Sequence, residues 1–188
     1  MFEKTSKYIF ARRAKKHLKT DERERRFVNF DTARMVMLIF ESDYMEKNPE
    51  IRMIIRDLQD YGKKVKAWGF VDKKEVTTAN LPDFKILHHK DADFLKFPTA
   101  DFMRELSEIQ FDLLIDLTSK EILPLQYLAL HAQAACKVGI KKSENNIYDF
   151  VIDLDNQRVD AEGNPVEFDT LFIYNQINFY LKNIQTSD

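Results

Sequence analysis

The fold of this chain is decided by the stretch FDLLIDL, residues 111–117, a short apolar run with one acid at its second position and another near its end. The same pattern returns in YDFVIDL, residues 148–154. Strands that are buried on both faces of a sheet are apolar almost throughout and polar only near their ends. The two stretches therefore predict two strands of an open α/β sheet.

The rest of the chain alternates between segments with the patterns of strands and helices. The resulting order is β-α-β-β-α-β-α-β-β-α, which is typical of one α/β domain with a parallel centre. Further strands are expected at residues 34–40, 64–71, 85–89 and 137–140, and helices at 49–61, at 98–109, from 118 or 123 to 135, and at about 168–184.

Several residues mark where these helices begin and end. Asn48, followed by proline, is typical of a helix cap, and Gly62 is typical of a helix end. Thr118 and Glu121 have the spacing of a capping box, in which each side chain binds a free backbone N–H group. A proline at position 124 favours a later start, near Leu123.

The connection between the last two strands suggests an exception to the parallel pattern. It is KKSENNI, residues 141–147, and parallel neighbours usually need a crossover of a dozen or more residues. We therefore expect these two strands to be antiparallel. The predicted fold is a three-layer Rossmann-like sandwich with a mostly parallel central sheet and an antiparallel edge strand.

Composition points to an ordinary soluble protein. The chain has 188 residues, of which 44% are hydrophobic and 32% are charged. Its one cysteine, Cys136, excludes an internal disulfide and a multi-cysteine metal site, and we expect it to be a small buried apolar group. No apolar run is long enough to span a bilayer, and the N-terminus lacks the apolar core of a secretory signal. We expect a cytoplasmic protein.

Positive charge is concentrated at the N-terminus. Residues 1–30 hold ten Lys or Arg and four Asp or Glu, whereas the whole chain has a net charge of −2. We expect this segment to be a basic, helical arm, followed by a single domain at 31–188. The arm could attract nucleic acid phosphates or an anionic membrane surface. The favoured alternative is a solvated helix that contacts the body through Ile9, Ala14 and Leu18, because Tyr8 and Phe10 precede the densest charges and make a weak stacking platform.

Ligands of open α/β sheets bind beyond the carboxyl ends of the strands, where the strand order reverses. If the strands at 34–40 and 111–117 are neighbours, the polar residues that follow them line such a crevice. Helix N-termini and lysines there suit a small anion such as phosphate or sulfate. The candidate ligand-binding residues are Ser42, Asp43, Tyr44, Asp116, Thr118, Ser119, Lys120, Lys141 and Lys142.

Each candidate also has a structural explanation. Thr118 can act as a helix cap, Asp116 can accept backbone hydrogen bonds near a strand end, and Lys141 and Lys142 can lie in a solvated turn.

Common catalytic and cofactor motifs are missing. The turn after the first strand contains no glycine, although a dinucleotide fingerprint or a P-loop needs glycine there, and no serine lies in a G-x-S-x-G elbow. His88 and His89 are neighbours on an expected strand, so their side chains point to opposite faces and cannot share a metal ion. We expect no cofactor and no metal, and we favour a protein without catalytic activity.

The FDLLIDL stretch, the Ala/Leu-rich helix after it and the following KVGI (residues 137–140) resemble the N-terminal half of heptosyltransferase-like glycosyltransferases. The likeness covers roughly residues 34–142. The chain is also similar to a small bacterial family of stand-alone proteins without an assigned function. The resemblance implies a Rossmann-like fold. Glu41 to Tyr44 replaces the Gly-Asp turn of the transferases, and the chain is too short for their second, nucleotide-sugar domain.

Three functions follow from these observations. The first is a Rossmann-like module that binds a small anionic ligand or a protein partner at the crevice, and that could self-associate through the aromatic helix at 168–184. The second is a degenerate or partner-dependent glycosyltransferase that uses Asp43 and Asp116. The third is a nucleic-acid-associated protein that uses the basic arm.

Overall fold

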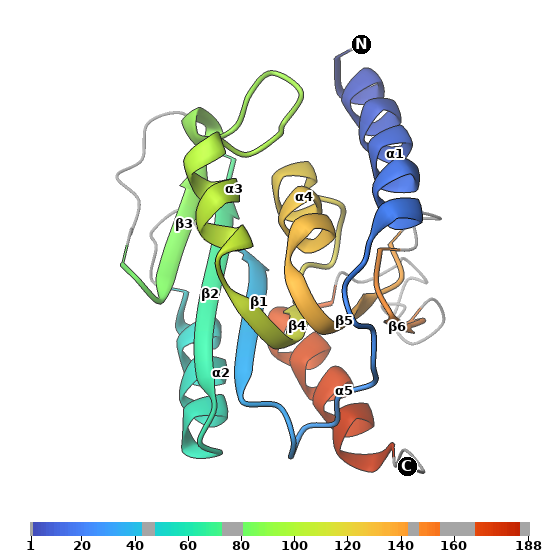
Figure 1. Ribbon diagram of the computed structural model, residues 1–188. Helices are drawn as coiled ribbons and strands as arrows, with labels where there is room; N and C mark the ends of the chain where they lie inside the picture. Colours follow the sequence, from blue (N-terminus) through green and yellow to red (C-terminus); the bar gives the residue numbers. More distant parts are fainter. Residues whose placement is uncertain (1, 43–47, 73–80, 143–146, 155–167, 185–188) are drawn as a thin grey trace, which may run out of the picture.

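The computed structural model describes residues 2–42, 48–72, 81–142, 147–154 and 168–184 (Figure 1). The helices are α1 (Phe2–Thr20), α2 (Pro49–Asp60), the 3₁₀ turn η1 (His89–Asp91), α3 (Ala100–Ser107), α4 (Leu123–His131) and α5 (Thr170–Asn183). The strands are β1 (Met35–Glu41), β2 (Lys64–Val71), β3 (Phe84–His88), β4 (Gln110–Asp116), β5 (Gln133–Ile140) and β6 (Phe150–Ile152).

The six strands form one sheet in the order β3-β2-β1-β4-β5-β6. Every pair of neighbours in it is parallel. This is the order of a doubly wound, Rossmann-like sheet. The strand of FDLLIDL, β4, is the neighbour of the first strand, which is the condition on which the expected crevice depended. The strand order therefore reverses between β1 and β4, and their carboxyl ends mark the switch point.

The predicted antiparallel edge strand is wrong, because β6 runs parallel to β5. β6 has only three residues, and it pairs with the last three residues of β5, from Val138 opposite Phe150 to Ile140 opposite Ile152. After Ile140 the chain has to return by the rise of only two residues, about 7 Å. The nine residues between Ile140 and Phe150 are long enough to cover this distance, so the parallel pairing requires no crossover helix. The length expected of a crossover applies to chains that return along a whole strand.

Helices cover both faces of the sheet and make three layers (Figure 1). Val36, Leu38 and Phe40 of β1 belong to the core on the side of α2 and α5. Met37 and Ile39 alternate with them and belong to the core on the side of α1, α3 and α4. Because both faces are buried, β1 is apolar almost throughout, as the sequence pattern indicated.

The turn into α2 differs from the expected cap. Asn48 stands at the cap position, but its backbone is left-handed, with φ 38°, and its side chain does not cap the helix. Its amide Nδ2 instead donates to Ser42 Oγ at 3.1 Å, which ties the start of α2 to the end of β1. Gly62 follows the helix with φ 74°, a conformation that favours glycine, and this agrees with the predicted helix end.

The helix after β4 begins at Leu123, so the later of the two predicted starts is correct and the capping box of Thr118 and Glu121 is wrong. It also ends earlier than expected, at His131, since the chain becomes extended and pairs with β4 from Gln133 onward. Alanine favours helix over strand, so the pairing with β4 overrides the local preference of this segment. All residues of α4 except the last are buried, which explains why the helix is apolar on every side.

The N-terminal helix α1 packs against this buried helix. Phe10 is 1% exposed and its ring meets the Tyr127 ring edge-on, with 4.8 Å between centroids. Ala14 is also buried, Leu18 packs against the same core and Ile9 is half-buried. None of the helices in the described part of the chain has both the length and the apolarity needed to cross a membrane.

The segment that follows α1 is held by Arg23, whose side chain is only 4% exposed. Its guanidinium binds both oxygens of Asp149, at 2.6 and 2.8 Å, and the carbonyl of Ala134 at 2.7 Å. Asp149 also accepts the backbone N–H of Lys137 at 2.8 Å. One of the basic residues of the arm is therefore an internal structural contact. The division into an arm and a domain stays a prediction.

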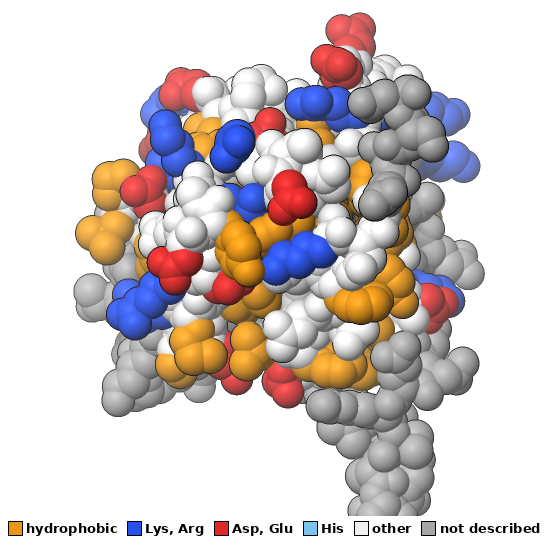
Figure 2. Space-filling model, turned by 90° about the horizontal axis from the view of Figure 1, so that it is seen from below, with side chains coloured by type: hydrophobic (Ala, Val, Ile, Leu, Met, Phe, Trp, Pro, Cys, Tyr) orange, Lys and Arg blue, Asp and Glu red, His pale blue; other side chains and the backbone are white. Residues whose placement is uncertain are grey.

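The amino edge of the strands carries a different mixture of side chains. Lys182 Nζ lies 4.3 Å from the centre of the Phe30 ring and 4.4 Å from that of Tyr61. Figure 2 shows this edge from below, with apolar side chains between positive and negative ones. Charge of a single sign does not dominate the part of this face that the described residues form.

Candidate ligand-binding site

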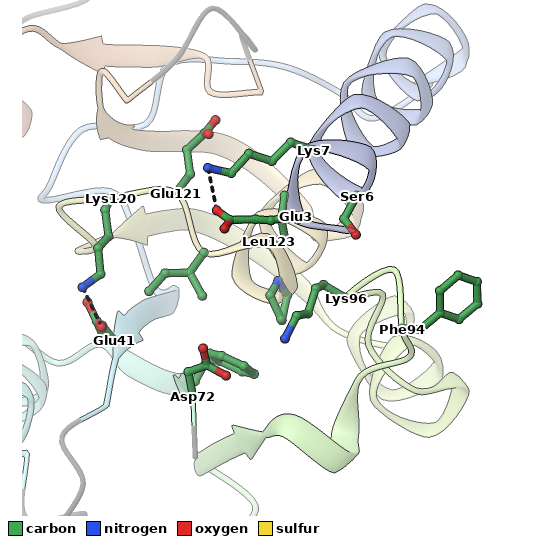
Figure 3. Close-up of a pocket in the computed structure, with 13 residues that line it drawn as sticks. Glu3, Ser6, Lys7, Glu41, Asp72, Phe94, Lys96, Lys120, Glu121 and Leu123 are labelled. Carbon is green, nitrogen blue, oxygen red and sulfur yellow. Dashed lines mark ion pairs between the residues drawn. The ribbon is translucent and has the colours of Figure 1, made fainter. Parts of the chain in front are cut away.

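A cavity of about 560 Å³ lies at the carboxyl edge of the sheet, beside the switch point between β1 and β4 (Figure 3). Its walls come from the first turns of α1, the ends of β1 and β2, the turn at residues 93–97 and the start of α4. The cavity therefore collects segments that are far apart in the sequence. It lies at the edge where the sequence predicted a crevice.

The inner wall of the cavity is apolar. Phe70 at the end of β2 and Leu123 and Pro124 at the start of α4 line it, and all three are buried. Phe94 is also part of the lining, but it is 80% exposed and Figure 3 shows its ring pointing away from the other lining side chains. A ligand in the cavity would thus meet hydrocarbon and aromatic surface beside the polar groups of the rim.

Two ion pairs lie in the rim. Lys120 Nζ is 3.0 Å from Glu41 Oε1, and Lys7 Nζ is 3.1 Å from Glu3 Oε1. The side chains of both pairs are about half exposed or more, so we expect each pair to contribute little to stability. Their effect on the cavity is to neutralise four of the charged groups that line it.

Apart from these two ion pairs, Lys96 and Asp72 are charged residues that line the cavity. Figure 3 shows the Lys96 amino group and the Asp72 carboxylate pointing toward one another across the cavity. Neither forms an ion pair with any residue that the structure describes. A third charge, Glu121, lines the side near α4. Figure 3 shows its carboxylate pointing away from Lys96 and Asp72, so the cavity offers a ligand one cation, Lys96, and one carboxylate, Asp72.

The turn at residues 93–97 places Lys96 by means of an unusual backbone. Lys96 has φ 66°, in the left-handed region that lysine rarely adopts and that costs roughly 1–3 kcal/mol. Asp93 stabilises the turn, because its Oδ1 accepts the N–H groups of Leu95 and Phe97, at 2.8 and 2.9 Å. Its carbonyl accepts the N–H of Lys96 at 2.9 Å. The local sequence thus fixes a conformation that directs a lysine into the cavity.

Of the residues predicted from the sequence, Lys120 lines this cavity. Ser42 is buried and binds Asn48, and Ser119 is half-buried and not part of the cavity wall. Asp43 and Tyr44 lie outside the described residues.

Asp116, Thr118 and Lys142 come together elsewhere, in a buried network. Asp116 is fully buried, and its Oδ1 accepts Thr118 N at 2.8 Å and Thr118 Oγ1 at 2.7 Å. Its Oδ2 lies 2.7 Å from Lys142 Nζ and accepts the Tyr148 hydroxyl and the Gln126 amide. Lys142 also donates to Thr118 Oγ1 at 2.6 Å. Every acceptor site of Asp116 is therefore used within the protein.

This network gives the three residues a structural role, but Thr118 caps no helix and Lys142 is buried, so the expected helix cap and solvated turn are wrong. The Lys142 side chain is 3% exposed, and burial lowers its pKa although Asp116 opposes the shift. Burial likewise raises the pKa of Tyr148 well above its ordinary value. The Tyr148 ring lies against Gly139, where an added Cβ would be 3.1 Å from a ring carbon. We infer that the network fastens Lys142 and Tyr148, which lie after β5 and before β6, to the end of β4. The other lysine of this turn, Lys141, pairs with Asp153 at 2.6 Å on the surface.

Sequence reasoning missed Lys96 and Asp72 in the cavity, and Tyr148 and Gln126 in the network. Lys96 has only a weak signal, the aspartate three residues before it, which is a common turn residue. Tyr148 opens the second copy of the apolar phrase, and its partner Asp116 belongs to the first copy. The hydrogen bond therefore links the two copies, which no local pattern can show.

Comparison with known proteins identifies the family of this chain but assigns no activity to it. A model of a family of unknown function, DUF6913, matches residues 7–162. No curated protein and no solved structure matches the chain. The match agrees with the predicted similarity to a family without an assigned function, whereas the resemblance to glycosyltransferases stays a prediction. Since the match covers most of the sequence, this chain belongs to the DUF6913 family of unknown function.

Proposed function

We propose that this protein is a non-catalytic module that binds a small anionic molecule in the cavity at the carboxyl edge of β1 and β2. The observation that carries the proposal is Lys96, which a left-handed backbone directs into the cavity without an ion-pair partner among the described residues. The location supports it too, because open α/β sheets bind ligands beside the switch point. The cavity, about 560 Å³, also has the volume of small-molecule sites.

The charges of the rim narrow the class of ligand. Lys96 would bind one carboxylate or phosphate, whereas Asp72 would repel further negative charge and accept hydrogen bonds from hydroxyl or amino groups. The apolar wall at Phe70 and Leu123 would take a hydrocarbon or planar part. These features favour a molecule with one anionic group, some hydrogen-bond donors and an apolar body, and they disfavour a polyphosphate.

Thermal-shift screening tests this function directly. The panel includes inorganic phosphate, sugar monophosphates, nucleoside monophosphates, amino acids and nucleotide sugars. A ligand at a hundred times its Kd stabilises the native state by about 2.7 kcal/mol, which raises Tm by roughly 5–11 °C in a protein of this size. A hit among the nucleotide sugars alone would favour the glycosyltransferase-like alternative.

A matched pair of variants assigns the hit to the cavity. Lys96→Met removes the cation that lines the cavity, and Lys64→Met removes an exposed cation from the first residue of β2, at the opposite edge of the sheet. We expect Lys96→Met to abolish the stabilisation and Lys64→Met to preserve it. A ligand that stabilises both variants equally binds elsewhere and refutes the proposed site.

Self-association through α5 remains a separate proposal. The helix turns Ile173, Ile177 and Leu181 into the core, and Phe179 is 60% exposed. Light scattering tests it: a dimeric mass that Phe179→Ser converts to a monomeric one would support this contact, and a monomeric mass of the unaltered protein would exclude it.

A further inference from the structure

The exposed side of α1 gathers positive charge into one continuous stripe. At 3.6 residues per turn, five cations of the helix and one tyrosine fall within an arc of about 120°. All six are exposed, and Tyr8 is 69% exposed. The stripe consists of Lys4, Tyr8, Arg12, Lys15, Lys16 and Lys19.

No carboxylate neutralises this stripe among the described residues. The one acid of α1, Glu3, is about 100° away around the helix and pairs with Lys7. The five cations of the stripe form no ion pair with any residue that the structure describes. They extend over sixteen residues, from Lys4 to Lys19, or about 22 Å of helix. Nothing in the fold of the described part requires so many unpaired positive charges on one face.

The apolar face of the same helix is already occupied. Phe10 and Ala14 are buried against α4, so α1 has no free hydrocarbon face to insert into a bilayer. Figure 1 shows α1 at the flank of its layer, with its first turns beyond the carboxyl edge of the sheet. The outward side of the helix can therefore meet a partner only through its charges and Tyr8.

We propose that this stripe binds single-stranded nucleic acid through its phosphates, with a base stacked on Tyr8. A stripe of about 22 Å is long enough to contact several successive phosphates of one strand. The helix places Tyr8 between Lys4 and Arg12, although in the sequence it precedes the densest charges. This gives an aromatic surface beside a cationic track, which is the arrangement that binds single strands without sequence preference. The proposal is independent of the cavity.

Fluorescence anisotropy with a labelled oligothymidylate of about twelve nucleotides tests it, at 50 to 200 mM salt. Five phosphate contacts predict a slope of about −3.5 in a plot of log K against log salt concentration. The variant Arg12→Ala/Lys15→Ala/Lys19→Ala leaves two contacts and a slope of about −1.4. Alanine favours helix, so the variant should fold, which circular dichroism checks.

Two controls separate the stripe from charge in general. The variant Arg56→Ala/Lys64→Ala/Lys90→Ala removes the same number and types of exposed cations from other elements, and it should bind as the unaltered protein does. Tyr8→Ala should weaken binding about fivefold or more, whereas Tyr8→Phe should preserve it. Equal binding by the two triple variants, no binding of the oligonucleotide, or binding of phosphatidylglycerol vesicles in its place would overturn the proposal.

Discussion

The buried network around Asp116 gives the sharpest prediction for stability. The change is Asp116→Asn, which keeps the shape of the side chain and removes its charge. Asp116 is fully buried and Lys142 Nζ lies 2.7 Å from its Oδ2. The asparagine amide can still accept from Thr118 through one oxygen. Its NH₂ group, however, would replace an oxygen that faces three donors, from Lys142, Tyr148 and Gln126.

The expected loss follows from that mismatch. Removing one partner of a buried ion pair costs about 3–5 kcal/mol, because the other charge stays buried without compensation. For a protein of this length the loss corresponds to a decrease in Tm of roughly 6–20 °C. Lys142→Met should cost less than Asp116→Asn. In the Lys142→Met variant, the Asp116 carboxylate would still accept four hydrogen bonds, two from Thr118 and one each from Tyr148 and Gln126.

Urea unfolding measures these losses, and the fluorescence of the single tryptophan, fully buried Trp68, reports the transition. The double variant Asp116→Asn/Lys142→Met removes both charges. It should be more stable than Asp116→Asn alone, with a coupling energy of about 2 kcal/mol. A loss below about 1 kcal/mol for Asp116→Asn, or strictly additive losses in the double variant, would refute the structural role of the network.

Three further changes test other parts of the fold. Burial lowers the pKa of Lys137 to about 7 from 10.5, so the unfolded chain binds more protons between those values and stability should rise with pH from 7 to 10. Lys137→Met should remove this rise when the free energy of unfolding is measured against pH by denaturation. The same rise with pH in the variant and the unaltered protein would contradict the lowered pKa of Lys137. Burial also lowers the pKa of His131 to about 4 from 6.5, so stability should fall as pH falls from 6.5 to 4. His131→Phe should reduce this loss of stability at low pH. An NMR titration of His131 with a midpoint near 6.5 would contradict the lowered pKa. Gly139→Ala should cost about 1–3 kcal/mol in urea, because its Cβ would displace the Tyr148 ring, and an unchanged midpoint would show that the ring can move freely.

The fold was predictable wherever a local pattern determines an element. The apolar runs gave β1, β2 and β4 to within a residue or two, and Gly62 marked the end of α2. The sequence left open whether β1 and β4 are neighbours; the sheet shows that they are, as in other doubly wound sheets.

The errors lie where a contact distant in sequence decides the local structure. The direction of β6 depends on its pairing with only the last three residues of β5, which the length of the connection cannot reveal. The capping box is wrong because Thr118 binds Asp116 in place of capping a helix, and the later of the two predicted starts, Leu123, is correct. Both differences depend on contacts that form only in the folded chain, the pairing of β6 with β5 and the hydrogen bond of Thr118 to Asp116.

The sequence allowed us to predict at which edge of the sheet the candidate site lies, but not which residues line it. The carboxyl edge beside β1 and β4 follows from topology, and Lys120 lies there. Lys96 comes from a turn after β3 whose left-handed residue is a lysine, and sequence patterns assign such positions to glycine or asparagine. Asp116, another of the candidates from the sequence, is buried and already binds Lys142 and Tyr148.

A crystal structure with the most stabilising molecule of the screen tests the central claim most directly. We predict that the ligand occupies the cavity between β1, β2 and α4, with an anionic oxygen about 2.7–2.9 Å from Lys96 Nζ and its apolar part against Phe70. A ligand bound at another surface, with the cavity empty and Lys96 without contact to it, would contradict the claim.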